Sequence, residues 1–190
     1  MKTRSKILTA IRSLLDQKGF LEVETPTLQP VYGGGFARPF VTHHNALDAD
    51  FYLRISDEMY LKRLLVGGFE KVYEITKVFR NEGIDHDHNP EFTMFEAQIA
   101  YENYEYGMNI FEEIFEHAAL SALGTTTVQH GEVMIELKRP WKRMRLIDAV
   151  ETIGGLPHSA WQSLETAKQT LGSKISAKKQ SELDKLQTIG

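Results

Sequence analysis

The sequence of 190 residues contains no cysteine, which excludes disulfide bonds and thiolate metal sites and fits a reducing compartment. No apolar run approaches the roughly 18 residues of a membrane-spanning helix, and the first residues lack the apolar core of a secretion signal. The formal net charge is -4, so the chain lacks the general basic excess that binds nucleic-acid backbones. Contact with nucleic acid would therefore need local basic patches or another part of the protein.

What is present is an ordinary globular composition, 42% hydrophobic and 25% charged, in a chain long enough for one domain with a sizeable core. Apolar residues at helical spacing predict helices at Lys2–Lys18 and Asn103–Ala122. Further elements are expected as strands at Phe20–Glu24, Phe36–His44, Asp50–Ile55 and Val133–Leu137, a helix from Ser56 or Asp57 to Val66, a helix at Arg145–Thr152, and surface helices at about Leu164–Leu171 and Lys178–Leu186.

The most informative segment is a predicted β-hairpin. Lys71–Phe79 and Phe92–Tyr101 are rich in β-branched and aromatic residues, and Gly83–Pro90 between them has the composition of a turn. Alternation places Phe92, Met94, Glu96 and Gln98 on one side of the second strand. Arg80 and Glu82 are expected on the face opposite Glu96. A guanidinium beside carboxylates suits a ligand that carries both phosphates and an amine.

This hairpin resembles the second signature motif of the class II aminoacyl-tRNA synthetases, and specifically of the lysyl-tRNA synthetases. Several further blocks agree in order, so that the resemblance covers roughly residues 3 to 150: Phe20–Pro26, Gly33–Phe40, Thr42–Asp48, Leu53–Arg63 and Gly67–Glu70. The Thr42-His43-His44-Asn45 block separates the lysyl members from the aspartyl and asparaginyl ones. The resemblance implies an α+β fold, an antiparallel sheet flanked by helices, of which this chain would hold an incomplete part.

The resemblance also implies an ATP site. Arg80 matches the catalytic arginine that bridges the α-phosphate and the amino-acid carboxylate. Glu82 matches the carboxylate that contacts the adenine amino group, Phe92 matches the aromatic residue on which adenine stacks, and His88 lies with Asn89 in the loop that approaches the phosphates. A surface salt bridge for Arg80 and a solvated loop position for His88 are the plain alternatives.

A lysine site is implied by the same comparison. Glu58 and Glu96 match the residues that hold the α-amine, Gly34 matches a glycine whose backbone approaches the substrate, and Arg80 faces the carboxylate. The plain alternative for Glu58, at a first helical turn, is that it only complements the helix dipole. One position departs from the family: Gln98 stands where a tyrosine usually helps to recognise the ε-amine, and an amide offers no aromatic face to an ammonium group.

The resemblance divides the chain at residue 156. Residues 1–156 correspond to a partial catalytic domain with the first two motifs, and residues 157–190, which have few large apolar side chains, to the start of a helical insertion. The anticodon-binding domain and the third motif are expected to be missing, and the magnesium ligands with them. No metal site is expected within these residues, because His43 and His44 are adjacent in a strand and cannot easily turn both rings to one ion.

The implied function is lysine–tRNA ligation in the cytoplasm, with lysine, ATP and tRNA(Lys) as partners, Mg²⁺ as cofactor and no membrane association. This chain would be a catalytic-domain fragment of such an enzyme, expected to be inactive alone. A homodimer is expected through the first helix and strand, although that helix can also simply pack on its own core. Two other functions stay open at this point. One is a shortened paralogue that ligates lysine to a protein, and the other is a non-catalytic remnant that acts through the dimer-forming helix.

Overall fold

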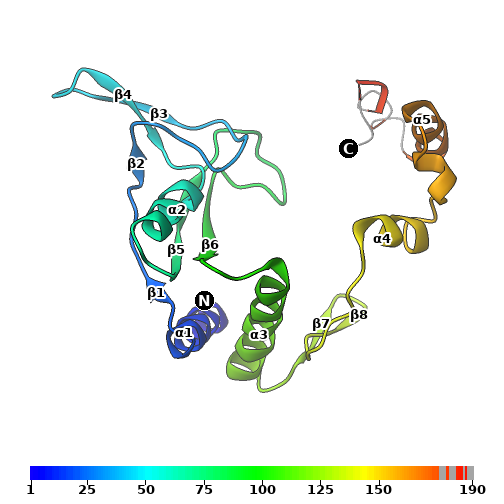
Figure 1. Ribbon diagram of the computed structural model, residues 1–190, viewed down its shortest axis with the longest axis horizontal. Coiled ribbons are helices and arrows are strands. Elements are labelled where there is room, and N and C mark those ends of the chain that lie inside the picture. Colours follow the sequence, from blue (N-terminus) through cyan, green and yellow to red (C-terminus); the bar gives the residue numbers. More distant parts are fainter. Residues whose placement is uncertain (176–178, 180–182, 186, 188–190) are drawn as a thin grey trace. The chain divides into compact units, whose positions relative to one another are not determined.

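Figure 1 shows the computed structural model, which describes residues 1–175, 179, 183–185 and 187. The chain divides into two compact units, Met1–Pro140 and Trp141–Gly190. Among the described residues, no helix combines the length and the apolar character needed to cross a membrane. All of the predicted site residues lie in the first unit.

The first unit is built on a sheet of three strands in the order β1-β5-β6, formed by Leu21–Glu22, Lys71–Phe79 and Glu91–Ile99. β5 and β6 pair antiparallel over their whole length, and Glu74 lies opposite Glu96. The predicted hairpin is thereby confirmed. β1 pairs parallel to β5, so the expected antiparallel sheet has one parallel strand at this edge.

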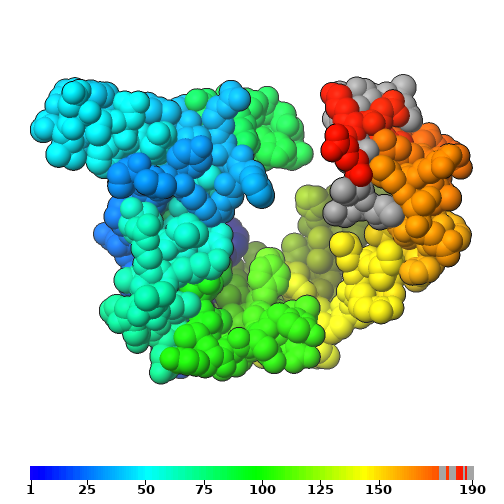
Figure 2. All heavy atoms as spheres, turned by 45° about the horizontal axis from the view of Figure 1, so that its top comes forward, coloured from blue at the N-terminus to red at the C-terminus, as the bar shows by residue number. Residues whose placement is uncertain are grey.

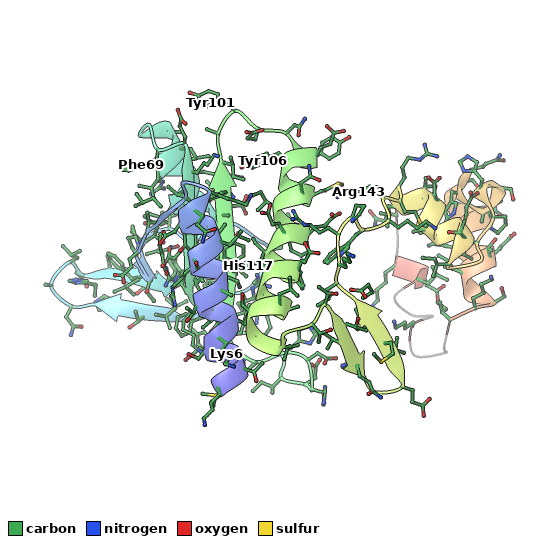
Figure 3. All side chains as sticks on the ribbon, turned by 90° about the horizontal axis from the view of Figure 1, so that it is seen from below. Lys6, Phe69, Tyr101, Tyr106, His117 and Arg143 are labelled. Carbon is green, nitrogen blue, oxygen red and sulfur yellow. The ribbon has the colours of Figure 1, made fainter. Side chains whose placement is uncertain are left out.

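One face of this sheet is apolar and carries the core. Odd-numbered residues of β5 and β6, such as Tyr73, Ile75 and Phe95, pack against helices α1 (Lys2–Gln17) and α3 (Tyr104–Leu123). The two helices run side by side, with Lys6 on α1 and with Tyr106 and His117 on α3 (Figure 3). The buried members of the cluster are Leu14, Leu15, Phe20, Tyr73, Ile110 and Ile114. The 3.6-residue spacing of the apolar side chains explains why both segments are helical.

A second sheet has the order β2-β4-β3 and is antiparallel throughout, with the bounds Leu28–Gln29, Ala49–Leu53 and Val41–His44. The β3–β4 hairpin projects from the rest of the first unit (Figure 2). The predicted strand Phe36–His44 forms only in its second half. Pro39 interrupts the pattern, and the carbonyl of Arg38 accepts instead from the backbone N–H of Asn81 at 2.8 Å.

The remaining elements are short. α2 (Glu58–Val66) follows β4 and lies beside the face of β5 and β6 that α1 and α3 leave uncovered. A hairpin of β7 (Thr127–His130) and β8 (Val133–Glu136) follows α3. The second unit contains α4 (Leu146–Thr152), the 3₁₀ helix η1 (His158–Trp161) and α5 (Leu164–Gly172). β2, β7 and η1 were not predicted, and the helix predicted at Lys178–Leu186 lies largely outside the described residues.

Candidate functional site

The second face of the central sheet carries polar and charged side chains among apolar ones, and a buried ion pair organises it. Arg54 and Glu74 are 4% and 3% exposed, and their charged groups lie 2.7 Å apart. The Arg54 guanidinium also donates to the carbonyl oxygens of Lys77 at 2.8 Å and Thr25 at 3.1 Å. These bonds compensate the cost of burying the charges and fix the segment after β4 against β5.

The turn from this segment into α2 holds Glu96 of β6. Ser56 Oγ donates to Glu96 Oε2 at 2.8 Å, and the backbone N–H of Asp57 donates to the same oxygen at 3.2 Å. Ser56 Oγ in turn accepts from the backbone N–H of Glu58 at 3.1 Å, while the carboxylate of Glu58 pairs with Lys62. Glu58 and Glu96 are thereby brought to one turn, although they are far apart in sequence.

Gly34 lies directly on this turn. Its φ of +87° belongs to the left-handed region that favours glycine, and an added Cβ would lie 2.7 Å from Ser56 Oγ and 3.2 Å from Glu58 Cβ. The structure therefore brings three predicted site residues, Gly34, Glu58 and Glu96, together around Ser56. Gln98 shares the face of Glu96 and lies across from Val72.

Arg80 lies on the same face as Glu96, so the expectation that Arg80 and Glu82 lie on the opposite face is wrong. Val78 pairs with Phe92, and Arg80 continues the alternation two residues later, where its N–H still bonds to the Pro90 carbonyl at 2.9 Å. The Arg80 guanidinium lies over the Phe92 ring at 5.2 Å from the centroid. Its Nε donates to the Ile55 carbonyl at 3.5 Å, which links Arg80 to the segment that holds Glu96.

A pocket of about 340 Å³ opens at the tip of the hairpin, and the whole predicted ATP set lines it: Arg80, Glu82, His88, Asn89 and Phe92, with Gly83, Asp87 and Pro90. His88 Nδ1 lies 2.7 Å from Asp85 Oδ1, and this carboxylate raises the pKa of His88 above its usual value. The pKa of Asp85 is lowered, first by the backbone N–H of Asp87 and then by His88. His88 therefore keeps its positive charge over more of the neutral range than a free histidine.

Asp57 is the most perturbed group at the site. Its side chain is fully buried, and burial followed by the nearby Glu96 carboxylate raises its pKa to about 8. Within the described part of the chain, neither carboxyl oxygen has a hydrogen-bond partner. Burial and the neighbouring carboxylate thus both favour the protonated form of Asp57.

Ser56, Asp57 and Arg54 are the site residues that sequence reasoning missed. A signal was available, since three polar residues flank Ile55 between a strand and a helix, and Glu74 lies between the apolar residues Tyr73 and Ile75 of a predicted strand. In the part of the chain that the structure describes, no three His, Cys, Asp or Glu side chains gather in a way that would hold a metal ion.

Comparison with known proteins agrees with these residues. Residues 1–185 match the family described as tRNA synthetases class II (D, K and N). Lysine–tRNA ligase from Pelotomaculum thermopropionicum is 55% identical over 166 residues, covering 87% of this chain and 33% of that protein. The lysine–tRNA ligases of Bacillus subtilis and Carboxydothermus hydrogenoformans are 53% and 58% identical over 167 and 153 residues, covering 88% and 80% of this chain and 34% and 31% of theirs.

The chain thus spans about a third of the length of these relatives. The match extends through both units and includes Gly34, Glu58 and Glu96 as well as every residue that lines the pocket at the hairpin tip. The chain belongs to the class II tRNA synthetases of the D, K and N group.

Proposed function

We propose that this chain forms the lysine- and ATP-binding part of a lysine–tRNA ligase, which joins lysine to AMP and then transfers it to tRNA(Lys). The observation that carries the proposal is the convergence of Gly34, Glu58 and Glu96 on Ser56, next to the Arg80–Phe92 pair. Carboxylates for an amine and a cation for phosphate meet there on one face of one sheet.

In this proposal Glu58 and Glu96 bind the α-amine of lysine, and Arg80 binds its carboxylate. The fixed position of Glu96, which accepts from Ser56 Oγ and from the Asp57 N–H, supports such a role because a preorganised carboxylate loses little entropy on binding. Gly34 admits the substrate backbone close to the turn. Gln98 offers an amide to the lysine side chain, so we expect a weaker side-chain contact than an aromatic residue provides.

ATP occupies the pocket at the hairpin tip in this proposal. Adenine stacks on Phe92 and meets Glu82, while Arg80, His88 and Asn89 face the phosphates. A lysine carboxylate oxygen attacks the α-phosphorus and pyrophosphate leaves, so negative charge grows on the phosphoryl oxygens. Arg80 stabilises that charge electrostatically, and His88, whose pKa is raised by Asp85, adds to this in its protonated form.

Magnesium is the cofactor expected for such a reaction. No group of three carboxylate or imidazole ligands gathers among the described residues, so Mg²⁺ would depend here on fewer side chains together with the ATP phosphates. No part of the mechanism proposed for this chain therefore depends on a metal ligand of its own.

The remaining proposals follow from the family. We infer that the two described sheets and α1–α3 belong to a catalytic domain of the class II type, acting in the cytoplasm on tRNA(Lys). We also place a homodimer contact at α1. An apolar groove of about 300 Å³ supports a second copy there, lined by Ile7 and Ile11 of α1 and by Phe115 and Leu123 of α3. The molar mass in solution tests this contact.

The proposed function is tested in a chimera in which this chain replaces the matching segment of the B. subtilis enzyme. Lysine-dependent exchange of pyrophosphate into ATP measures adenylate formation. Glu96→Gln removes the charged partner of the amine, and we expect kcat/KM for lysine to fall at least about tenfold.

Glu91→Gln is the matched control, because Glu91 lies on the same strand, on the other face, in an exposed pair with Lys77. It should change kcat/KM by less than about twofold. A folded chimera that forms no lysyl-adenylate, or equal effects of the two substitutions, would contradict the proposed function.

A further inference from the structure

Asp57 presents an unusual combination of contacts. Its backbone N–H donates to Glu96 Oε2 at 3.2 Å, while its own carboxyl group is fully buried beside Glu96. Neither oxygen of that carboxyl group finds a partner within the described residues. A buried carboxyl group without a hydrogen-bond partner indicates that a proton is bound and released at this position, because such a group is costly when it is charged and unsatisfied.

The groups around Asp57 determine which acid carries the proton. Glu96 faces it from β6 and accepts hydrogen bonds from Ser56 Oγ and the Asp57 N–H. Glu74 faces it from β5 and is neutralised by Arg54, and Glu58 of α2 is paired with Lys62. Among the described residues, Glu96 is thus the carboxylate next to Asp57 that no cation neutralises. Two adjacent carboxyl groups, one fully buried and one half-buried, disfavour joint ionisation at neutral pH.

We propose that the buried Asp57 and the half-buried Glu96 form an acid pair that holds one proton while the amine pocket is empty and releases it when an ammonium group enters. Asp57 acts in this pair as a positioning residue, since it holds Glu96 through its backbone and sets the charge of the pocket through its side chain. The second half of this proposal, the release of the proton when an ammonium group enters, rests on the proposed lysine site. The step breaks one O–H bond of the Asp57 carboxyl group, and the proton passes to the solvent.

The first half predicts a measurable titration without any ligand. In the 190-residue chain with ¹³C-labelled carboxyl groups, one NMR carboxyl signal should remain protonated at about pH 6 and titrate near neutrality. Asp57→Asn should remove this signal, and Asp50→Asn, at an exposed position of β4, should leave it in place. Glu96→Gln should shift the titration to lower pH, because the neighbouring charge is gone.

The second half is tested by calorimetry of lysine binding at about pH 7 in two buffers of different ionisation enthalpy. We expect the unsubstituted chain to release about one proton for each lysine bound, and Asp57→Asn to release almost none. A merely structural role of Asp57 would weaken binding without changing this stoichiometry.

Each outcome separates the two proposals. Carboxyl signals that all titrate below about pH 5 overturn the acid pair, whatever lysine does. Lysine binding by the unsubstituted chain without proton release overturns the coupling. If lysine does not bind at all, the proposed function fails, and the ligand-free titration still decides whether Asp57 and Glu96 share a proton.

Discussion

At the scale of single residues, the difference between two ion pairs illustrates what burial does to charge. Arg54 and Glu74 are almost completely buried, whereas Arg12 and Glu22, whose guanidinium and carboxylate lie 3.0 Å apart, keep side-chain exposures of 45% and 36%. Removing one partner of a buried pair leaves an uncompensated charge in the interior, and removing one partner of an exposed pair leaves a charge that water solvates.

Arg54→Met should therefore lower the free energy of unfolding by about 3–5 kcal/mol, since Glu74 loses its charged partner. Arg12→Met is the control with the same change in side chain, and about 1 kcal/mol or less is expected there. Urea unfolding of the two variants measures both values. A loss at Arg54 no larger than that at Arg12 would mean that Glu74 finds another way to neutralise its charge.

Asp57 gives stability a distinct dependence on pH. Its pKa is about 8 in the folded chain and near the usual 3.8 when unfolded, so the folded state binds the proton more tightly. This contribution is fully present below about pH 4 and is lost as the pH rises towards 8, by at most about 1.4 kcal/mol per pH unit. Asparagine at this position has no such dependence.

Thermal unfolding of Asp57→Asn and of the unsubstituted chain between about pH 5 and pH 8 measures the difference. We expect the variant to gain relative to the unsubstituted chain as the pH rises. A constant difference across this range would show that Asp57 does not carry the extra proton.

The sequence alone predicted Gly34, Glu58, Glu96, Arg80 and the hairpin-tip residues as site residues, because each lies in a recognisable sequence motif. It did not reach Ser56 or Asp57. Their importance depends on where Glu96 arrives in space, and that contact joins positions 40 and 39 residues apart. It also assigned Arg80 to the wrong face. Which residues of β5 and β6 share a face depends on the pairing register across the turn, and the sequence does not fix that register.

At the scale of elements, the close contact of Gly34 with the start of α2 can be tested separately from the backbone strain at this glycine. Gly34→Ala should lower lysine affinity at least about tenfold, since the added Cβ would displace Ser56 Oγ and with it Glu96. Gly68→Ala is the control: its φ of +99° gives comparable strain, but nothing lies within 4 Å of the new Cβ.

Calorimetry of lysine binding, with thermal unfolding measured alongside, compares the two variants. Both should lose a similar amount of stability, about 1 kcal/mol or somewhat more, and only Gly34→Ala should lose affinity as well. Equal affinities would separate Gly34 from the amine site.

Elements with a strong local pattern were predicted well. β5 has the predicted bounds, and α1 and α3 deviate from theirs by a single residue at each end at most. β2 and the parallel pairing of β1 depend on contacts with distant segments, which no local pattern contains. The predicted strand at Phe36–Phe40 failed for the same reason, because Asn81 from another part of the chain binds that backbone.

At the scale of the whole molecule, the division of the chain after Pro140 predicts that the first unit folds independently of the second. Every contact described for the site lies within Met1–Pro140, as does the apolar core beneath the sheet. A chain that ends at Pro140 should therefore fold cooperatively and keep the amide NMR shifts of Ser56, Glu58 and Glu96 close to those of the 190-residue chain. Widespread shift changes in β5 and β6 would contradict the independence of this unit.

The central sheet places the core and the site on opposite faces of the same two strands. A library of all single substitutions in β6 can be scored for both protein abundance and lysine activation. The two effects should then alternate from one position to the next along the strand. Changes at Phe95, Ala97 and Ile99 should reduce abundance, and changes at Phe92, Glu96 and Gln98 should reduce activation while abundance persists. Along this strand, selection for folding and selection for recognition act on alternate codons, so each can vary with little interference from the other.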